Sequence, residues 1–155
     1  MILSTMVYIQ KEGKVLLLHR TKKQNDTNEG KYLGVGGRFE ANESPDDCIY
    51  REVREETGLI MNSFAYRGVV TFVSDTYPTE YMFIYTCDDF SGEMIECNEG
   101  DLYWVEKEKM FDLPMWAGDR LFLERMEKSD KPFSMKVRYV GDTLAEAYDG
   151  IKKLV

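Results

Sequence analysis

The pattern of apolar and polar positions along the chain consists mainly of short β-rich runs. Residues Leu3 to Ile9 and Val15 to Arg20 are rich in apolar and β-branched side chains, and Glu12-Gly13 between them is a turn signal. Three further runs of this kind follow later in the chain: Ala65 to Val73, Glu80 to Cys87 and Leu102 to Val105. These runs predict the strands of a sheet.

The clearest helix signal begins at Ser44. Ser44 is a good N-cap, Pro45 suits the first turn, and Asp46 and Asp47 complement the positive end of a helix. Gly58 is placed to end the helix, because glycine readily adopts the left-handed conformation that follows a last turn. The sequence therefore predicts one helix between Ser44 and Gly58.

The remaining segments complete an α+β domain. Thr21 to Lys31 is polar and predicts a long loop, and Asp119 to Lys128 predicts a second helix. Lys136 to Val140, followed by Gly141-Asp142, indicates a late hairpin, although the tail from Ala145 could equally be helical. Strands mixed with few helices predict a mixed β-sheet core flanked by helices, in a single domain over residues 1–155.

Composition and charge narrow the function classes. The chain has 155 residues, of which 43% are hydrophobic and 31% charged, which is typical of a globular protein with one core. Its formal net charge is −8. An acidic surface repels a phosphate backbone, which argues against binding of polymeric DNA or RNA. A small phosphate ligand remains compatible, because a bound metal ion inverts the local field.

Cysteine usage and hydropathy predict a cytoplasmic location. Cys48, Cys87 and Cys97 share no metal-binding spacing and would leave one thiol unpaired in any disulfide scheme, so we expect reduced thiols. No apolar run approaches the roughly 18 residues of a membrane span, and we identify no targeting segment. The oligomeric state is open between a monomer and a homodimer.

Three glutamates share one face of the first predicted helix. On a 3.6-residue period, Glu52, Glu55 and Glu56 fall within about a 100° arc. Like charges at these spacings destabilise an isolated helix by roughly a few tenths of a kcal/mol per pair. A hard divalent cation such as Mg²⁺ needs clustered oxygen ligands and removes that repulsion. The three residues alone leave a solvated acidic face as the alternative.

The spacing around this helix is more specific. From Gly37 the chain runs five residues to Glu43, seven more residues, and then Arg51-Glu52-Val53-Arg54-Glu55-Glu56-Thr57-Gly58-Leu59. This sequence resembles the Nudix box at every fixed and apolar position, an agreement expected by chance on the order of one in 10⁹ starting positions. The resemblance implies the Nudix fold, an α/β/α sandwich, and hydrolysis of a nucleotide at a phosphorus atom by water.

The resemblance also implies roles for the box residues. Glu52, Glu55 and Glu56 would bind Mg²⁺, for which Mn²⁺ is a possible substitute. A backbone carbonyl of Gly36 or Gly37 would approach the same metal, where a side chain would obstruct it.

The resemblance also implies roles for three residues that lie near the predicted metal ligands: Arg51, Glu43 and Glu99. Arg51 would pair with box glutamates and orient them, and Glu43 is more consistent with a supporting residue than with a direct ligand. The general base varies within the family, and Glu99 matches an outlying glutamate that serves as base or metal ligand in some members. A solvated loop carboxylate is the alternative for Glu99.

Outside the box the chain resembles the MutT-like 8-oxo-dGTP diphosphatases, also called oxidised purine nucleoside triphosphatases. Met115-Trp116-Ala117-Gly118-Asp119 is one of the segments that carries this looser match. The resemblance implies that Trp116 stacks on a purine and that Asp119 reads the edge of the base. A core or lid tryptophan is the alternative for Trp116, and an N-cap of the following helix is the alternative for Asp119.

Two departures from that subfamily concern the base. Leu33 stands where mammalian members carry an asparagine that contacts the base, and Gly118 stands where they carry a second acid. We place further candidates in the substrate site: Leu33, Phe72 and Met82 in the pocket wall and Lys23 near the triphosphate.

The sequence therefore predicts a Mg²⁺-dependent hydrolase of purine nucleoside triphosphates, with oxidised dGTP as the leading substrate and a monophosphate plus pyrophosphate as products. One rival keeps the enzyme class but acts on dinucleoside polyphosphates or nucleotide sugars. Another is a non-catalytic Nudix module that binds nucleotides for regulation.

Overall fold

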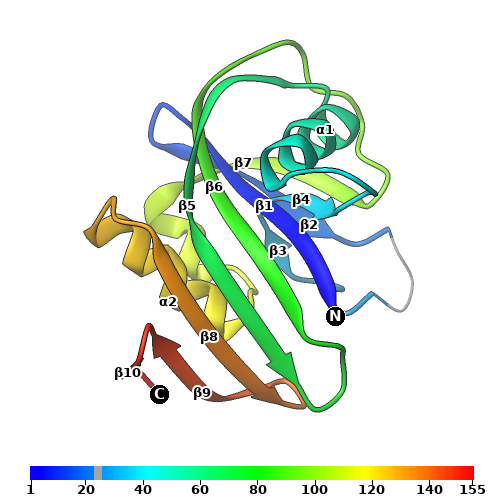
Figure 1. The fold of residues 1–155 in the computed structure, drawn as a ribbon. Coiled ribbons are helices and arrows are strands. Elements are labelled where there is room, and N and C mark those ends of the chain that lie inside the picture. Colours follow the sequence, from blue (N-terminus) through cyan, green and yellow to red (C-terminus); the bar gives the residue numbers. More distant parts are fainter. Residues whose placement is uncertain (23–25) are drawn as a thin grey trace.

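The protein forms one large mixed sheet with a helix on each face, as a computed structural model that describes residues 1–22 and 26–155 (Figure 1). The strands are β1 (Ile2–Lys11), β2 (Lys14–Arg20), β3 (Tyr32–Leu33), β4 (Val35–Arg38), β5 (Ile60–Ser74), β6 (Glu80–Ser91), β7 (Gly100–Glu106), β8 (Phe133–Val140), β9 (Thr143–Asp149) and β10 (Lys152–Lys153). The helices are α1 (Pro45–Thr57), α2 (Ala117–Lys128) and a short 3₁₀ helix, η1 (Lys107–Asp112).

Strand order brings distant segments together. The path through the sheet is β10-β9-β8-β5-β6-β1-β2-β3, with β4 paired to β1 and β7 paired to β2. The pairs β1–β6 and β5–β8 are parallel, and all other pairs are antiparallel. β4 therefore lies beside the N-terminal half of β1, where Gly37 pairs with Thr5 and Gly36 with Met6.

Each face of the sheet is covered by a helix and an apolar cluster, and the side chains of β1 contribute to both clusters. Val7 and Ile9 belong to the apolar cluster that includes Ile49 of α1, whereas Met6 and Tyr8 belong to the cluster under α2. Successive side chains of a strand point to opposite faces, so a strand covered on both sides is apolar throughout. The expected arrangement of an α/β/α sandwich is confirmed.

The ends of α1 follow from its local sequence. The Ser44 hydroxyl accepts a hydrogen bond from the Asp47 backbone N–H at 3.0 Å, and the Asp47 carboxylate accepts one from the Ser44 N–H at 3.0 Å. At the other end, Gly58 has φ +79°, the left-handed conformation that suits glycine. The helix predicted between Ser44 and Gly58 is confirmed.

Other elements differ from the sequence-based expectations at their ends. β5 begins at Ile60 rather than Ala65, α2 begins two residues before Asp119, and the tail after Ala145 is a strand rather than a helix. The tail pairs with β8, so the antiparallel ladder outweighs the local propensity of the segment. None of the helices in the described part of the chain is long and apolar enough to cross a membrane.

Candidate functional site

The α1 glutamates are organised by one arginine. Arg51 donates through Nε to Glu43 Oε2 at 2.7 Å and through Nη1 to Glu52 Oε1 at 2.8 Å and Glu55 Oε2 at 3.1 Å. The hydrogen bond from Arg51 is the main cause that lowers the pKa of Glu43 to about 2. Glu43 is thus bound to Arg51 in the way expected of a supporting residue.

Glycine at position 37 leaves room for a carboxylate. A Cβ atom built on Gly37 would lie 2.5 Å from Cδ of Glu52 and 2.6 Å from each of its carboxylate oxygens. Such approaches are far inside van der Waals contact, so any other residue here would push Glu52 away. The tight approach explains in physical terms why strand β4 needs glycine at this position.

Glu56 is the most buried of the three box glutamates. Its Oε2 accepts a hydrogen bond from the Gly36 backbone N–H at 3.3 Å. Burial raises its pKa well above the ordinary range, and the charge of Glu99 and a hydrogen bond with that carboxylate raise it further. Glu99 immediately precedes β7, so two carboxylates from distant segments of the chain meet here.

The pKa of Glu52 is also affected by the neighbouring carboxylates. Burial raises the pKa of Glu52, and the negative charges of Glu55 and Glu99 act in the same direction, against the opposing effect of Arg51. A group of carboxylates that burial and mutual repulsion hold toward the neutral form is stabilised by a cation that binds among them. The all-oxygen donor set matches a hard divalent ion.

The carboxylates are not yet gathered around one point. Within residues 1–22 and 26–155, no three histidine, cysteine, aspartate or glutamate side chains are arranged so as to hold a metal ion. Arg51 holds Glu52 and Glu55, while Glu56 lies beside Glu99. Arg51 binds one oxygen of Glu52 and one of Glu55, so the other oxygen of each remains available to an ion. The metal ligands expected from the sequence stay a prediction.

One cavity brings Glu99, which lies beside Glu56, together with a group of aromatic residues, although the three α1 glutamates do not line it. It has a volume of about 370 Å³, within the range of small-molecule sites. Its wall contains Gly36, Gly37 and Glu99 at one end. The same wall contains the residues proposed from the sequence for the substrate: Leu33, Phe72, Met82, Trp116 and Asp119. Lys23, the remaining proposed substrate residue, lies outside the described residues.

Trp116 is held by contacts on several sides. Its indole Nε1 donates to Asn28 Oδ1 at 2.7 Å, and its ring packs edge-on against Phe72 at 5.6 Å and Tyr139 at 4.9 Å between centroids. The Lys31 ammonium lies 4.3 Å from the ring centroid. With 6% of its surface exposed, Trp116 is both a packed residue and a wall of the cavity.

Asp119 is buried in the same wall. Its exposed fraction is 6%, and burial raises its pKa to about 7, while Lys31 opposes the rise and Glu80 adds to it. Its side chain is not the N-cap of α2, because Trp116 occupies that position and Asp119 lies inside the first turn. The alternative structural role considered for Asp119 is therefore wrong.

Gly118 has no room for the second acid of the mammalian enzymes. A Cβ atom there would lie 2.9 Å from both Tyr139 Oη and Val137 Cγ1. The Tyr139 hydroxyl also accepts a hydrogen bond from the Gly118 N–H at 2.6 Å. Strand β8 therefore closes this position.

Several residues of the site were not identified from the sequence. Arg20 donates through Nη1 to Glu99 at 3.1 Å and through Nε to Asp26 at 2.7 Å, and Asp26 accepts from the Asn28 N–H at 3.2 Å. Because Asn28 also binds Trp116, polar contacts connect Glu99 with the aromatic end. A basic residue at the end of β2 was the only sequence signal, and it did not reveal its partners.

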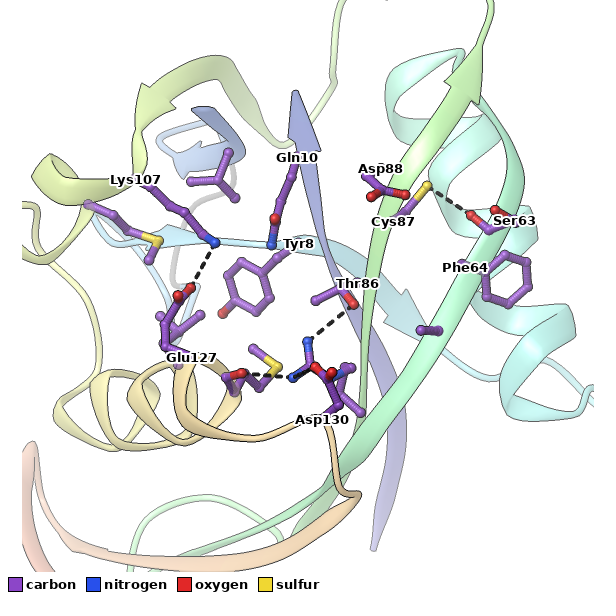
Figure 2. Close-up of a pocket in the computed structure, with 16 residues that line it drawn as sticks. Tyr8, Gln10, Ser63, Phe64, Thr86, Cys87, Asp88, Lys107, Glu127 and Asp130 are labelled. Atoms are coloured by element: carbon purple, nitrogen blue, oxygen red, sulfur yellow. Dashed lines mark hydrogen bonds and ion pairs between the residues drawn. The ribbon is translucent and has the colours of Figure 1, made fainter. Parts of the chain in front are cut away.

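A second cavity, of about 510 Å³, lies on the α2 face of the sheet (Figure 2). Lys107 forms an ion pair with Glu127 at 2.8 Å (Figure 2). Arg67 donates to the backbone carbonyls of Met126 and Ser129 at 2.9 and 3.0 Å. Lys107, Glu127 and Arg67 are thus satisfied by the protein itself, so the smaller cavity, which contains Glu99, Trp116 and Asp119, is the candidate active site.

Comparisons with known proteins agree with this geometry. The family model of the NUDIX domain matches residues 3–126. The uncharacterized Nudix hydrolase YvcI of Bacillus subtilis is 34% identical over 129 residues, which cover 80% of this chain and 78% of that protein. The oxidized purine nucleoside triphosphate hydrolase of Danio rerio is 29% identical over 126 residues, with coverage of 80% and 78%.

The fold is shared along nearly the whole chain. The crystal structure of the MutT protein from Bacillus halodurans superposes with a TM-score of 0.86 at 26% identity, covering 97% of this chain and 98% of that one. NAD-capped RNA hydrolases also match in part; that of Vibrio parahaemolyticus is 33% identical over 57% of this chain and 32% of its own length. The chain belongs to the Nudix family and is a hydrolase of pyrophosphate bonds in nucleoside diphosphate derivatives.

Proposed function

We propose that this protein is a divalent-metal-dependent pyrophosphohydrolase of purine nucleoside triphosphates, with oxidised dGTP as the leading substrate and Mg²⁺ as the metal. The observation that carries the proposal is the single cavity that runs from Gly37 and Glu99 to Trp116 and Asp119. Such an arrangement suits a nucleotide. Carboxylates that hold a metal ion lie near its phosphates, and an aromatic face and a buried polar group lie near its base.

At the acidic end, Glu52, Glu55, Glu56 and Glu99 are the residues that would hold the metal. Divalent ions bound there supply charge neutralisation at the phosphate oxygens and a lower pKa for the attacking water. Glu99 is the candidate to accept the proton of that water, and the hydrogen bond from Arg20 fixes the orientation of its carboxylate. Arg51 keeps Glu52 and Glu55 oriented toward the same side of α1.

At the other end, the protein provides a place for the base. Trp116 offers a stacking face worth about 1–3 kcal/mol for any base, so stacking gives affinity rather than selectivity. Asp119, buried in the wall, discriminates between bases because a wrong edge leaves it without a partner. The relationship to the Danio rerio enzyme, named for oxidized purine nucleoside triphosphates, supports this substrate class.

The decisive experiment is a nucleotide panel incubated with Mg²⁺, with identification of the products by chromatography. Release of a monophosphate and pyrophosphate from purine triphosphates is the expected result. ADP released from a dinucleotide, a sugar phosphate from a nucleotide sugar, or cleavage of an NAD cap would assign the protein to another Nudix substrate class. Nucleotide binding without turnover of any compound would indicate a regulatory module.

A substitution tests the metal end of the proposal. Glu55→Gln should reduce turnover by at least about two orders of magnitude, because a metal ligand and its charge are lost. The fold should persist, since the Glu55 side chain is largely exposed. Glu124→Gln, an exposed glutamate of α2, is the matched control. Turnover close to wild type in the Glu55 variant would contradict the metal assignment.

A further inference from the structure

A second carboxylate lies in the wall of the candidate base pocket. Glu80 is the first residue of β6, where it pairs with Ile2 of β1 and Phe72 of β5. Alternate residues of a strand share a face, so Glu80 points to the same side as Met82 and Ile84. Ile84 belongs to the apolar cluster under α2, and Glu80 and Met82 both line the 370 Å³ cavity.

Glu80 is held by a neutral group. The hydroxyl of Ser4, buried on the adjacent strand β1, donates to Glu80 Oε2 at 2.6 Å. In the part of the chain that the structure describes, no lysine, arginine or histidine side chain lies within ion-pair distance of Glu80. The hydrogen bond fixes the carboxylate and leaves its other oxygen available as an acceptor.

Asp119 provides the independent sign of a ligand. It is buried and lines the same cavity. Among residues 1–22 and 26–155, no hydrogen bond to its carboxylate is present. The charge of Glu80 contributes to the raised pKa of Asp119, so the two carboxylates lie close enough to interact. A buried acid that faces a cavity without a partner needs a ligand that supplies one.

The chemistry of the two acids restricts that ligand. Above the pKa of about 7 of Asp119 both carboxylates are ionised and only accept hydrogen bonds, so a base that fills this pocket must bring N–H groups. The Watson–Crick edge of guanine presents two neighbouring donors, the ring N1–H and the exocyclic amino group. Adenine presents one amino group beside a ring nitrogen that is itself an acceptor, so one acid would remain unpaired or face repulsion.

We propose that Glu80 is a specificity-determining residue which, together with Asp119, selects a base with two neighbouring N–H donors, as in guanine, over adenine. This inference rests on the proposed function for the location of the base in the cavity. It adds a second acid, from the first residue of β6, to a pocket wall in which Asp119 lies in the first turn of α2.

Binding of nucleoside monophosphates tests the inference without requiring turnover. Isothermal titration calorimetry at pH 8, where Asp119 is ionised, would compare deoxyguanosine monophosphate with deoxyadenosine monophosphate on the wild type, on Glu80→Gln and on Glu29→Gln. The wild type should prefer the guanine nucleotide. Glu80→Gln should weaken it about tenfold or more, as expected for loss of a hydrogen bond to a charged group, and change the adenine nucleotide less than about twofold. Glu29 is exposed and outside the cavity wall, so its variant should match the wild type.

Hydrolysis assays distinguish the role of Glu80 in base selection from the proposed hydrolase function. With dGTP and dATP as substrates, Glu80→Gln should raise the KM for dGTP and leave kcat nearly unchanged, because the residue contacts the base and not the reacting phosphate. An unchanged guanine preference in Glu80→Gln, or a wild type without that preference, would overturn the role of Glu80. A wild type that binds the guanine nucleotide selectively but hydrolyses no triphosphate would overturn the proposed function and leave the role of Glu80 supported.

Discussion

Replacement of Asp119 by asparagine should make the protein more stable at neutral and alkaline pH. Burial raises the pKa of this carboxyl from 3.8 to about 7, with Glu80 adding to the rise and Lys31 opposing it. The folded state therefore resists ionisation of Asp119, whereas the unfolded chain ionises it near pH 3.8. Asparagine has nearly the same shape and carries no charge at any pH, so Asp119→Asn removes this cost.

The size and the pH window follow from the two pKa values. Below about pH 3.8 Asp119 is neutral in both the folded and the unfolded state. The variant and the wild type should therefore have similar free energies of unfolding. Between about 3.8 and about 7 the folded wild type binds more protons than the unfolded chain, so its stability relative to the variant falls by about 1.4 kcal/mol per pH unit. Above pH 7 the difference reaches a plateau of ~4 kcal/mol.

Urea unfolding followed by circular dichroism at pH 5 and pH 8 would measure this difference. Asp112→Asn, an exposed aspartate, is the matched control and should change stability by less than about 0.5 kcal/mol at either pH. A gap between Asp119→Asn and the wild type that is the same at both pH values would show that Asp119 ionises normally. In that case the buried, unpaired acid on which the base pocket depends would be ruled out.

Two further substitutions probe the two ends of the cavity. Gly37→Ala should lower kcat by about two orders of magnitude or more, because the added methyl group would displace the Glu52 carboxylate. Steady-state kinetics over a range of Mg²⁺ concentrations would detect this loss. Activity at the wild-type level would refute the close approach of Glu52 to Gly37. Trp116→Ala should raise the KM for purine nucleotides more than for pyrimidine nucleotides, and equal effects on both would make Trp116 a packing residue only.

The stability of Asp119→Asn would also clarify why the pocket keeps an acid. A buried group that lowers stability at working pH is retained when it contributes to binding. Loss of base discrimination in a variant that is more stable would connect the two effects in one residue. The same reasoning applies less strongly to Glu80, because the hydroxyl of Ser4 already satisfies one of its oxygens.

The sequence by itself determined the features that depend on neighbours along the chain. Helix α1 follows from the Ser44–Asp47 capping pair and from Gly58, and its 3.6-residue period places Glu52, Glu55 and Glu56 on one face. Runs rich in apolar, β-branched and aromatic residues indicated the main strands. These are local effects of backbone geometry, so a linear pattern is enough to predict them.

Only the tertiary structure decided which side chains contact one another across the candidate site. Glu56 meets Glu99, Asn28 binds Trp116, and Glu80 joins Asp119 because of strand order and register, which bring together segments far apart in the sequence. A one-residue change in the register of β6 would turn Glu80 to the opposite face. Register is set by packing of the whole sheet against both helices, and no short stretch of sequence contains that information.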